Sequence, residues 1–296
     1  MRDDVISLFC DIDDFCNEFE PEKSKPKLPG DKKTRDRKGN LCVSEIMTIT
    51  VGFHQSCYRH FKGYYVNYVS KQLKELFPNL VSYPRFVALM ESVLVHLVAY
   101  MMSKKGKNTG ISYVDSTPLR ICNNRRIKRN KVFKNVAKRG KCSMGWFFGF
   151  KLHLIVNDMG EILAFNCSSG DIDDRHPLYK LTKEIEGKLF GDKGYISQEH
   201  FTELMKKGVQ LITNIRSNMK NKLMPIIDKI MLRKRFIIET INDQLKNISQ
   251  IEHSRHRSIP NFVVNLISGL IAYTHQKKKP SLNITNKELL VASAAF

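Results

Sequence analysis

The large apolar residues of this 296-residue chain change their spacing once, and that change separates two kinds of structure. Between Leu41 and Met102 they recur every three or four positions, which is the period of an amphipathic helix. After the polar segment 104–110 (KKGKNTG), short apolar runs alternate with turn residues, which is typical of strands. We therefore expect an all-helical N-terminal module followed by an α/β domain, with a mixed sheet flanked by helices.

The domain boundaries are expected where the composition shifts. Residues 21–40 carry many Pro, Lys and Asp residues but only one large apolar residue, Leu28, so this segment is predicted to be a solvated linker. The full prediction is an N-terminal helix at 1–20, a linker at 21–40, a helical module at 41–103, an α/β domain at 111–275 and a basic tail at 276–296.

Cysteine usage and the apolar runs indicate a cytoplasmic protein. The seven cysteines include no Cys-x-x-Cys pair, so reduced thiols are the simplest interpretation. The acidic first residues lead into no apolar run of the kind found in signal sequences. The longest apolar stretch, Phe86–Met102, is interrupted by Glu91, Ser92 and His96, so we expect no membrane span.

The charge of the chain restricts its partners. There are 49 basic and 29 acidic residues, a formal net charge of +20. Residues 104–151 hold 14 of the Lys and Arg residues and one acid, Asp115. Nucleic acid is the expected partner of such a surface, and an anionic membrane is the weaker alternative.

Within the α/β domain, the apolar runs and turn residues predict the individual elements. The predicted strands are 111–115, 150–156, 161–167, 188–192 and 209–215, with a hairpin turn at 157–160. The predicted helices are 197–207, 225–250 and 260–275.

Three acids stand where such elements can bring them together. Asp115 and Asp192 each end a predicted strand, and neighbouring strand ends open on one crevice. Their carboxylates suit a hard cation. Glu239 is predicted on a helix face that also carries Arg235 and Lys246, at 100° per residue. That face offers one acid for a metal and two cations for phosphate.

These acids lie in three motifs that together resemble a known family. The motifs are Tyr113–Thr117 (YVDST), Gly191–Tyr195 (GDKGY) and the spaced set Leu232-x2-Arg235-x3-Glu239-x6-Lys246. Residues 111–275 are similar to the catalytic domain of bacterial insertion-sequence transposases of the DDE type, which has an RNase H-like fold. One branch of that family has Tyr-x2-Arg-x3-Glu-x6-Lys as its third motif, so Leu232 replaces the tyrosine.

The resemblance implies an activity. Asp115, Asp192 and Glu239 would hold two Mg²⁺ ions, with Mn²⁺ as a substitute, about 3.5–4 Å apart. The enzyme would cleave phosphodiester bonds at the ends of the element and join the 3′-hydroxyl to target DNA. Its partner would be double-stranded DNA, both terminal repeats and target. Because two ends are joined together, we expect a homodimer on DNA, associated with the nucleoid when bound, and a helical module that recognises ends or makes dimer contacts.

The basic stretch 120–141 lies between the first catalytic strand and the hairpin, so we predict that it binds DNA. An exposed loop without contacts is the alternative. The complete set of predicted DNA-binding residues is Arg125, Arg126, Lys128, Arg129, Lys131, Lys138, Arg139, Lys141, Lys193, Tyr195, Arg235 and Lys246. For Trp146, a core position is favoured over a stacking platform for an unpaired base.

Other interpretations remain open at this stage. One is an RNase H-fold metal-dependent nuclease that does not transfer strands, and another is an inactive basic DNA-binding protein. Only 46 residues separate Asp192 from Glu239, too few for the large inserted β-domain of some relatives. A second acid cluster at Asp171, Asp173 and Asp174 is predicted to cap the following helix, with Asp174 as a reserve metal ligand.

Overall fold

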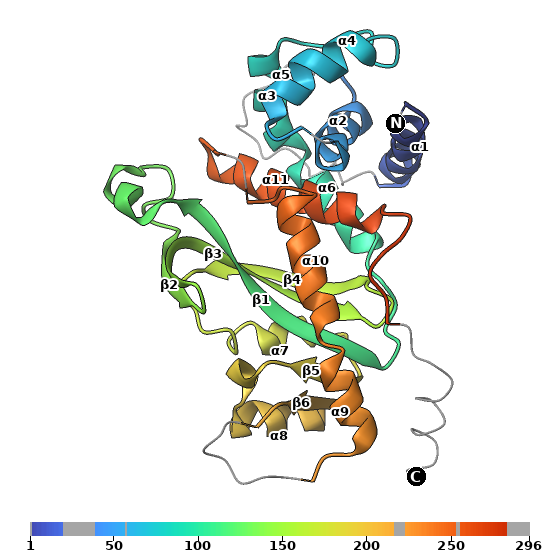
Figure 1. Ribbon diagram of the computed structural model, residues 1–296. Helices are drawn as coiled ribbons and strands as arrows, with labels where there is room; N and C mark the ends of the chain where they lie inside the picture. Colours follow the sequence, from blue (N-terminus) through green and yellow to red (C-terminus); the bar gives the residue numbers. More distant parts are fainter. Residues whose placement is uncertain (1, 20–38, 57, 216–222, 253–254, 283–296) are drawn as a thin grey trace, which may run out of the picture. The chain divides into compact units, whose positions relative to one another are not determined.

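The computed structural model describes residues 2–19, 39–56, 58–215, 223–252 and 255–282 (Figure 1). The α-helices are α1 (Arg2–Glu18), α2 (Val43–Gln55), α3 (Phe61–Gly63), α4 (Ser70–Gln72), α5 (Tyr83–Met90), α6 (Leu94–Ser103), α7 (Leu178–Leu181), α8 (Gln198–Lys206), α9 (Ile226–Arg233), α10 (Phe236–Asn247) and α11 (Ile259–Thr274). The strands are β1 (Ile111–Cys122), β2 (Lys138–Cys142), β3 (Gly145–Asn157), β4 (Ile162–Ser169), β5 (Gly187–Gly191) and β6 (Val209–Thr213). A π-helix, η1 (Tyr64–Val69), and the 3₁₀-helices η2 (Glu91–Val93), η3 (Asn124–Arg129) and η4 (Lys193–Tyr195) complete the set.

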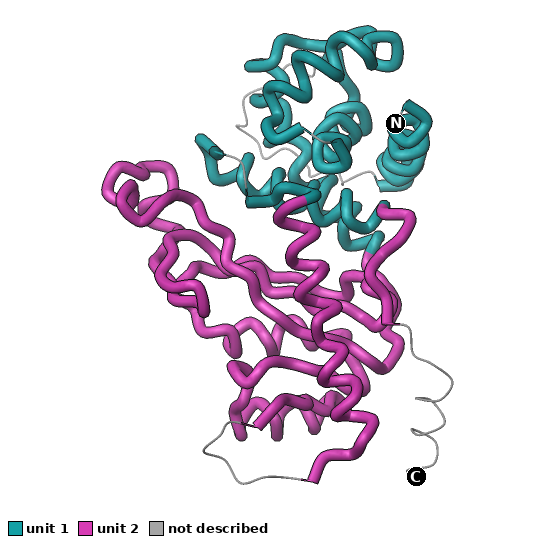
Figure 2. The backbone as a smooth tube through the Cα atoms, in the orientation of Figure 1, with its two compact units in different colours: residues 1–104, 248–275 teal, residues 105–247, 276–296 magenta. Residues whose placement is uncertain are grey.

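The chain forms two compact units (Figure 2). Unit 1 comprises residues 1–104 and 248–275, and unit 2 comprises residues 105–247 and 276–296. The predicted α/β domain ran to residue 275, but α11 packs against α2 and α6 in unit 1. Most of the predicted linker 21–40, and residues 283–296 of the predicted tail, lie outside the described residues.

Unit 1 is helical, as the apolar period predicts. Its helix α2 begins with a capping box, in which Cys42 accepts from the backbone of Glu45 while the Glu45 side chain accepts from the backbone of Cys42. Aromatic rings fill its interior: Phe86 lies with its centroid 4.8 Å from Tyr65 and 5.6 Å from Phe61. Such pairs add to the free energy of burial because the ring edges and faces carry opposite partial charges.

One part of unit 1 differs from the sequence prediction. The helical stretch Tyr83–Ser103 is 21 residues long and is apolar enough, by length and composition alone, to cross a membrane. From the sequence, the polar residues Glu91, Ser92 and His96 within this stretch led us to expect no membrane span. In the structure Phe86, Val93 and Leu97 of this stretch are buried within unit 1. Because the core helix of a soluble protein passes the same test, the finding is weak evidence for a membrane.

Unit 2 is built on a six-stranded mixed sheet with the order β2-β3-β1-β5-β6, and β4 pairs with β3 beside β2. β3 runs antiparallel to β1, β2 and β4, whereas β1, β5 and β6 are parallel. Antiparallel strands followed in the chain by two strands parallel to β1, with helices on the sheet, form an RNase H-like fold, as the sequence predicts.

Helices cover both faces of this sheet. Alternate residues of a strand point to opposite faces. On one face Val114 and Leu189 belong to a core cluster with Leu178 of α7 and Leu204 of α8. On the other face the Tyr113 hydroxyl donates to the backbone oxygen of Met231 in α9, and α10 packs against β1 (Figure 1).

Two of the elements that carry the predicted acids depart from the sequence prediction. β1 continues to Cys122 instead of ending at Asp115, so Asp115 lies within the strand. The helix predicted over 225–250 is divided at Lys234 and Arg235 into α9 and α10. Lys234, which would interrupt the apolar face of a single continuous helix, lies at this division.

Gly140 of β2 provides a test of the close packing at this end of the sheet. A Cβ atom at this position would lie 2.1 Å from the backbone oxygen of Gly170. A backbone atom cannot move aside as a side chain can, so Gly140→Ala is expected to destabilise the protein by about 1–3 kcal/mol. Thermal or urea unfolding measures this loss. The control is Gly194→Ala, whose Cβ would meet nothing within 4 Å. Equal stability of the two variants would contradict the packing.

Candidate active site

The register of two parallel strands places Asp115 beside Asp192. Tyr113 of β1 is paired with Phe190 of β5, and the two rings stack with centroids 5.4 Å apart on one face of the sheet. Asp115 and Asp192 each follow this pair by two residues, and Asp192 has an extended backbone. Because the side-chain period of a strand is two, both carboxylates emerge on the face that carries α9 and α10.

Helix α10 brings the third carboxylate to the same place. Arg235 precedes the helix, and its guanidinium lies 3.7 Å from Oδ1 of Asp115 while forming an ion pair with Glu239. One turn beyond Glu239, the side-chain amide of Asn242 donates to Oδ2 of Asp115 at 3.0 Å. Both oxygens of Asp115 are therefore held by side chains from one segment.

Asn242 was not among the predicted site residues. Its spacing of three from Glu239 places it on the same helix face, and that spacing was the available signal. The side chain is buried, and its Oδ1 atom has no hydrogen-bond partner among the residues that the structure describes.

The surroundings of Asp115 shift its pKa. Burial raises the pKa of Asp115 to about 6, Arg235 and a backbone N–H of Ser116 oppose this shift, and Glu239 and Asp192 add to it. Asp115 is the most enclosed of the three: its side chain is 21% exposed, Glu239 is 55% exposed and Asp192 lies at the surface.

These residues fit a divalent cation by their chemistry. All three supply carboxylate oxygens, which Mg²⁺ and Mn²⁺ prefer, and their mutual repulsion at Asp115 is relieved by positive charge. Across the described part of the chain, however, no three Asp, Glu, His or Cys side chains stand close enough to enclose a metal ion. In the structure the guanidinium of Arg235 is the cation that Asp115 and Glu239 share.

The predicted DNA-binding side chains are mostly exposed. Those of 125–141 all lie at the surface, as does Lys193, while Arg235 and Lys246 are half-buried. Lys138 pairs with Asp171 at 3.1 Å. Tyr195 differs, because its ring is 3% exposed and belongs to the core cluster, so its position gives no support to a DNA contact.

The prediction for Trp146 is corrected by its exposure. Phe147 and Phe148 are buried, as a core interpretation requires, but 56% of Trp146 is exposed. Trp146 therefore does not contribute a core side chain.

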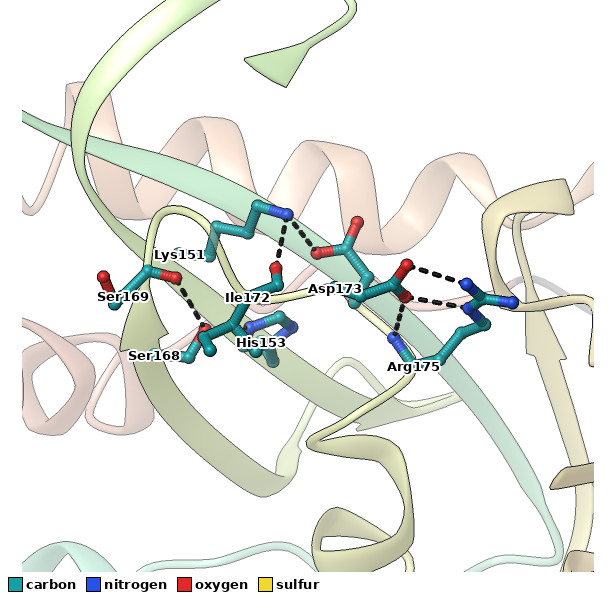
Figure 3. A network of polar contacts seen from close by, with 8 residues as sticks. Lys151, His153, Ser168, Ser169, Ile172, Asp173 and Arg175 are labelled. Atoms are coloured by element: carbon teal, nitrogen blue, oxygen red, sulfur yellow. Dashed lines mark hydrogen bonds and ion pairs between the residues drawn. The ribbon is translucent and has the colours of Figure 1, made fainter. Parts of the chain in front are cut away.

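The acid cluster after β4 has local partners (Figure 3). Asp173 accepts from the backbone and the guanidinium of Arg175, which lowers the pKa of its carboxyl group. Asp174 pairs with Lys151 at 2.9 Å, and Lys151 also donates to the backbone of Ile172. The predicted cap on the next helix is absent, because α7 begins after Pro177 without a side-chain cap.

Comparison with known families agrees with this geometry. The model of the transposase DDE domain family matches residues 105–259, just over half of the chain. None of the curated proteins compared with the chain matches it. The chain belongs to the transposase DDE domain family. This membership implies an enzyme of the transposase or nuclease kind that binds DNA and uses divalent metal.

The electrostatics at Asp115 lead to a stability prediction. The pKa of Asp115 in the folded protein is raised above its ordinary value. Ionisation of Asp115 therefore lowers the free energy of unfolding as the pH rises from 4 to 6, and the loss remains at higher pH. Asp115→Asn keeps the shape and the contact with Asn242 but removes the charge. At pH 7 it is expected to be as stable as the parent protein or more stable, by up to about 3 kcal/mol, although inactive.

The matched control is Asp228→Asn in α9. Asp228 is 4% exposed and pairs with Lys188 at 2.7 Å, so removal of its charge breaks a favourable pair. A loss of about 1–3 kcal/mol is expected, after allowance for the partial exposure of Lys188. Thermal unfolding of both variants at pH 7 makes the comparison, and a larger loss from Asp115→Asn than from Asp228→Asn would refute the interpretation.

Proposed function

We propose that this protein is a DNA transposase that cuts phosphodiester bonds at the ends of an insertion element and joins the freed 3′-hydroxyl to target DNA. The observation that supports the proposal is the contact of Arg235 with both Asp115 and Glu239, together with a strand register that carries Asp192 toward the same end of the sheet. Family membership supports the same reaction class.

In this proposal the chain's residues have separate tasks. Asp115, Asp192 and Glu239 would hold two Mg²⁺ ions, which when bound make a water or 3′-hydroxyl more nucleophilic and stabilise the leaving oxygen. Asn242 orients the Asp115 carboxylate by its hydrogen bond. Arg235 and Lys246, on the same segment as Glu239, offer positive charge to the phosphates on either side of the cut.

The exposed cations of 125–141 would bind the part of the duplex that lies outside the site of cutting. Each phosphate neutralised there steepens the salt dependence of binding. Because joining brings two ends and a target together, we further propose a homodimer on DNA, in the cytoplasm and associated with the nucleoid. The helical unit is proposed to recognise ends or to make the dimer contacts.

Cleavage in the presence of different ions tests the proposal. With an oligonucleotide that bears the terminal repeat, Mg²⁺ is expected to support cutting and Ca²⁺ binding alone. Asp115→Ala, Asp192→Ala and Glu239→Ala are each expected to lower the cutting rate by about 10³-fold or more, since all three act as one unit. Asp243→Ala is the control, because Asp243 lies exposed on α10 and bonds only with Asn247 among the contacts seen.

The rival activity is cutting without joining. A substrate with a pre-cut 3′-end bypasses the first step, so transfer of that end to a second duplex identifies a transposase. Cutting without any transfer would identify a metal-dependent nuclease. A parent protein that never cuts, with unchanged DNA binding in the three alanine variants, would leave only a basic DNA-binding protein.

A further inference from the structure

The β2–β3 hairpin of unit 2 presents apolar surface in the most basic part of the chain. Its turn, residues 143–144, joins Cys142 to Gly145, and Met144 in that turn is 80% exposed. Trp146 follows at 56% exposure, whereas Phe147 and Phe148 are buried beneath it. Because the ring of Trp146 is largely exposed, it adds little to the core that the neighbouring phenylalanines form.

One cation lies over this ring, and the neighbouring segments carry others. The guanidinium of Arg139 lies over it, 5.7 Å from the ring centroid. Lys141 is the cross-strand partner of Trp146, and its side chain is exposed. From the other side, the amide of Asn124 donates to the backbone oxygen of Trp146 at 2.8 Å, which fixes the basic 3₁₀-helix η3 next to it. The ring thus stands between two basic segments, η3 and β2.

A polyanion with flat apolar groups is the partner that suits such a surface. Phosphates match the cations, and a base offers the π-face that an exposed indole can stack upon. The bases of an intact duplex are stacked on each other and show only their edges in the grooves. An unpaired base is therefore the occupant that the ring can cover.

We propose that Trp146, with Arg139 over its ring, is a stacking site for an unpaired base of DNA. The inference rests on the proposed function, because it requires a DNA substrate with unpaired nucleotides, but it concerns a surface apart from the three carboxylates. Asp115 is paired with Leu154, eight positions further along β3. At about 3.3 Å per residue this separates the ring from Asp115 by roughly 26 Å or less, the length of about eight base steps. The site would hold a displaced strand at a distance from the cut.

The sequence offers a direct probe, because Trp146 is the one tryptophan in the chain. In a metal-free buffer of fixed salt, the full-length protein is titrated with a single strand of about 12 nucleotides, the matching duplex, and that duplex with an internal unpaired bubble. Stacking on a base is expected to quench the tryptophan emission with the single strand and the bubble. Little quenching is expected with the intact duplex, although anisotropy of labelled DNA shows that it binds.

Variants separate stacking from general attraction. Trp146→Ala is expected to weaken binding of the single strand by about 5- to 100-fold and to leave duplex affinity nearly unchanged. Tyr179→Ala is the matched control: Tyr179 is 52% exposed with Lys207 3.2 Å from its ring centroid, and its loss should change neither affinity. Circular dichroism of the variants establishes that the fold is intact.

The outcomes distinguish this inference from the proposed function. Emission that is unchanged by single strands, or an equal loss of single-strand and duplex binding in Trp146→Ala, overturns the stacking site even if the protein cuts and joins DNA. Quenching confined to unpaired bases in a protein that never cuts DNA supports the stacking site and rejects the transposase activity.

Discussion

Two like charges are held near each other in unit 2 by a guanidinium between them. Asp115 projects from β1 and Glu239 from α10, and Arg235 contacts both. Two carboxylates about 4 Å apart repel by about 4 kcal/mol at the effective dielectric of a protein surface, so a strand and a helix that each present one need a cation to pack. The chain supplies its own cation, four residues before Glu239, on the segment that has to dock.

This arrangement is a functional compromise. A carboxyl group that is buried, and lies near two others, is costly when ionised, which is why the pKa of Asp115 is raised to about 6. An apolar or amide side chain there would be compatible with the same fold. A carboxyl group with a pKa shifted by burial and by neighbouring charges is typical of functional sites. Asp228, which is more buried, is instead paired with Lys188.

Much of this site could be predicted from sequence, and the parts that could not have physical causes. The acids were predicted because strands and helix faces have fixed periods, and the fold because the motifs occur in order. The length of β1 was underestimated because the apolar run ends at Asp115, yet the strand continues beside β3 as far as Cys122. The break at Lys234 and Arg235 follows from the docking of Arg235 on Asp115, a contact 120 positions away in sequence that no local pattern contains.

The exposure of Trp146 is a second feature that no local sequence pattern predicts. Three aromatic residues in a row predict a strand entering the core, and period-two alternation would bury the first and third or the second alone. The structure buries Phe147 and Phe148 together, since β3 is covered on both faces from there, and leaves Trp146 at the edge, between η3 and β2. Which residue of such a run is exposed depends on where neighbouring strands and loops end. Those ends are set by β2 and by the hydrogen bond from Asn124, not by the run itself. From the sequence, the basic stretch 120–141 was expected to be either a DNA contact or an exposed loop without contacts. In the structure it also holds the backbone of Trp146, through Asn124, at the edge of the sheet.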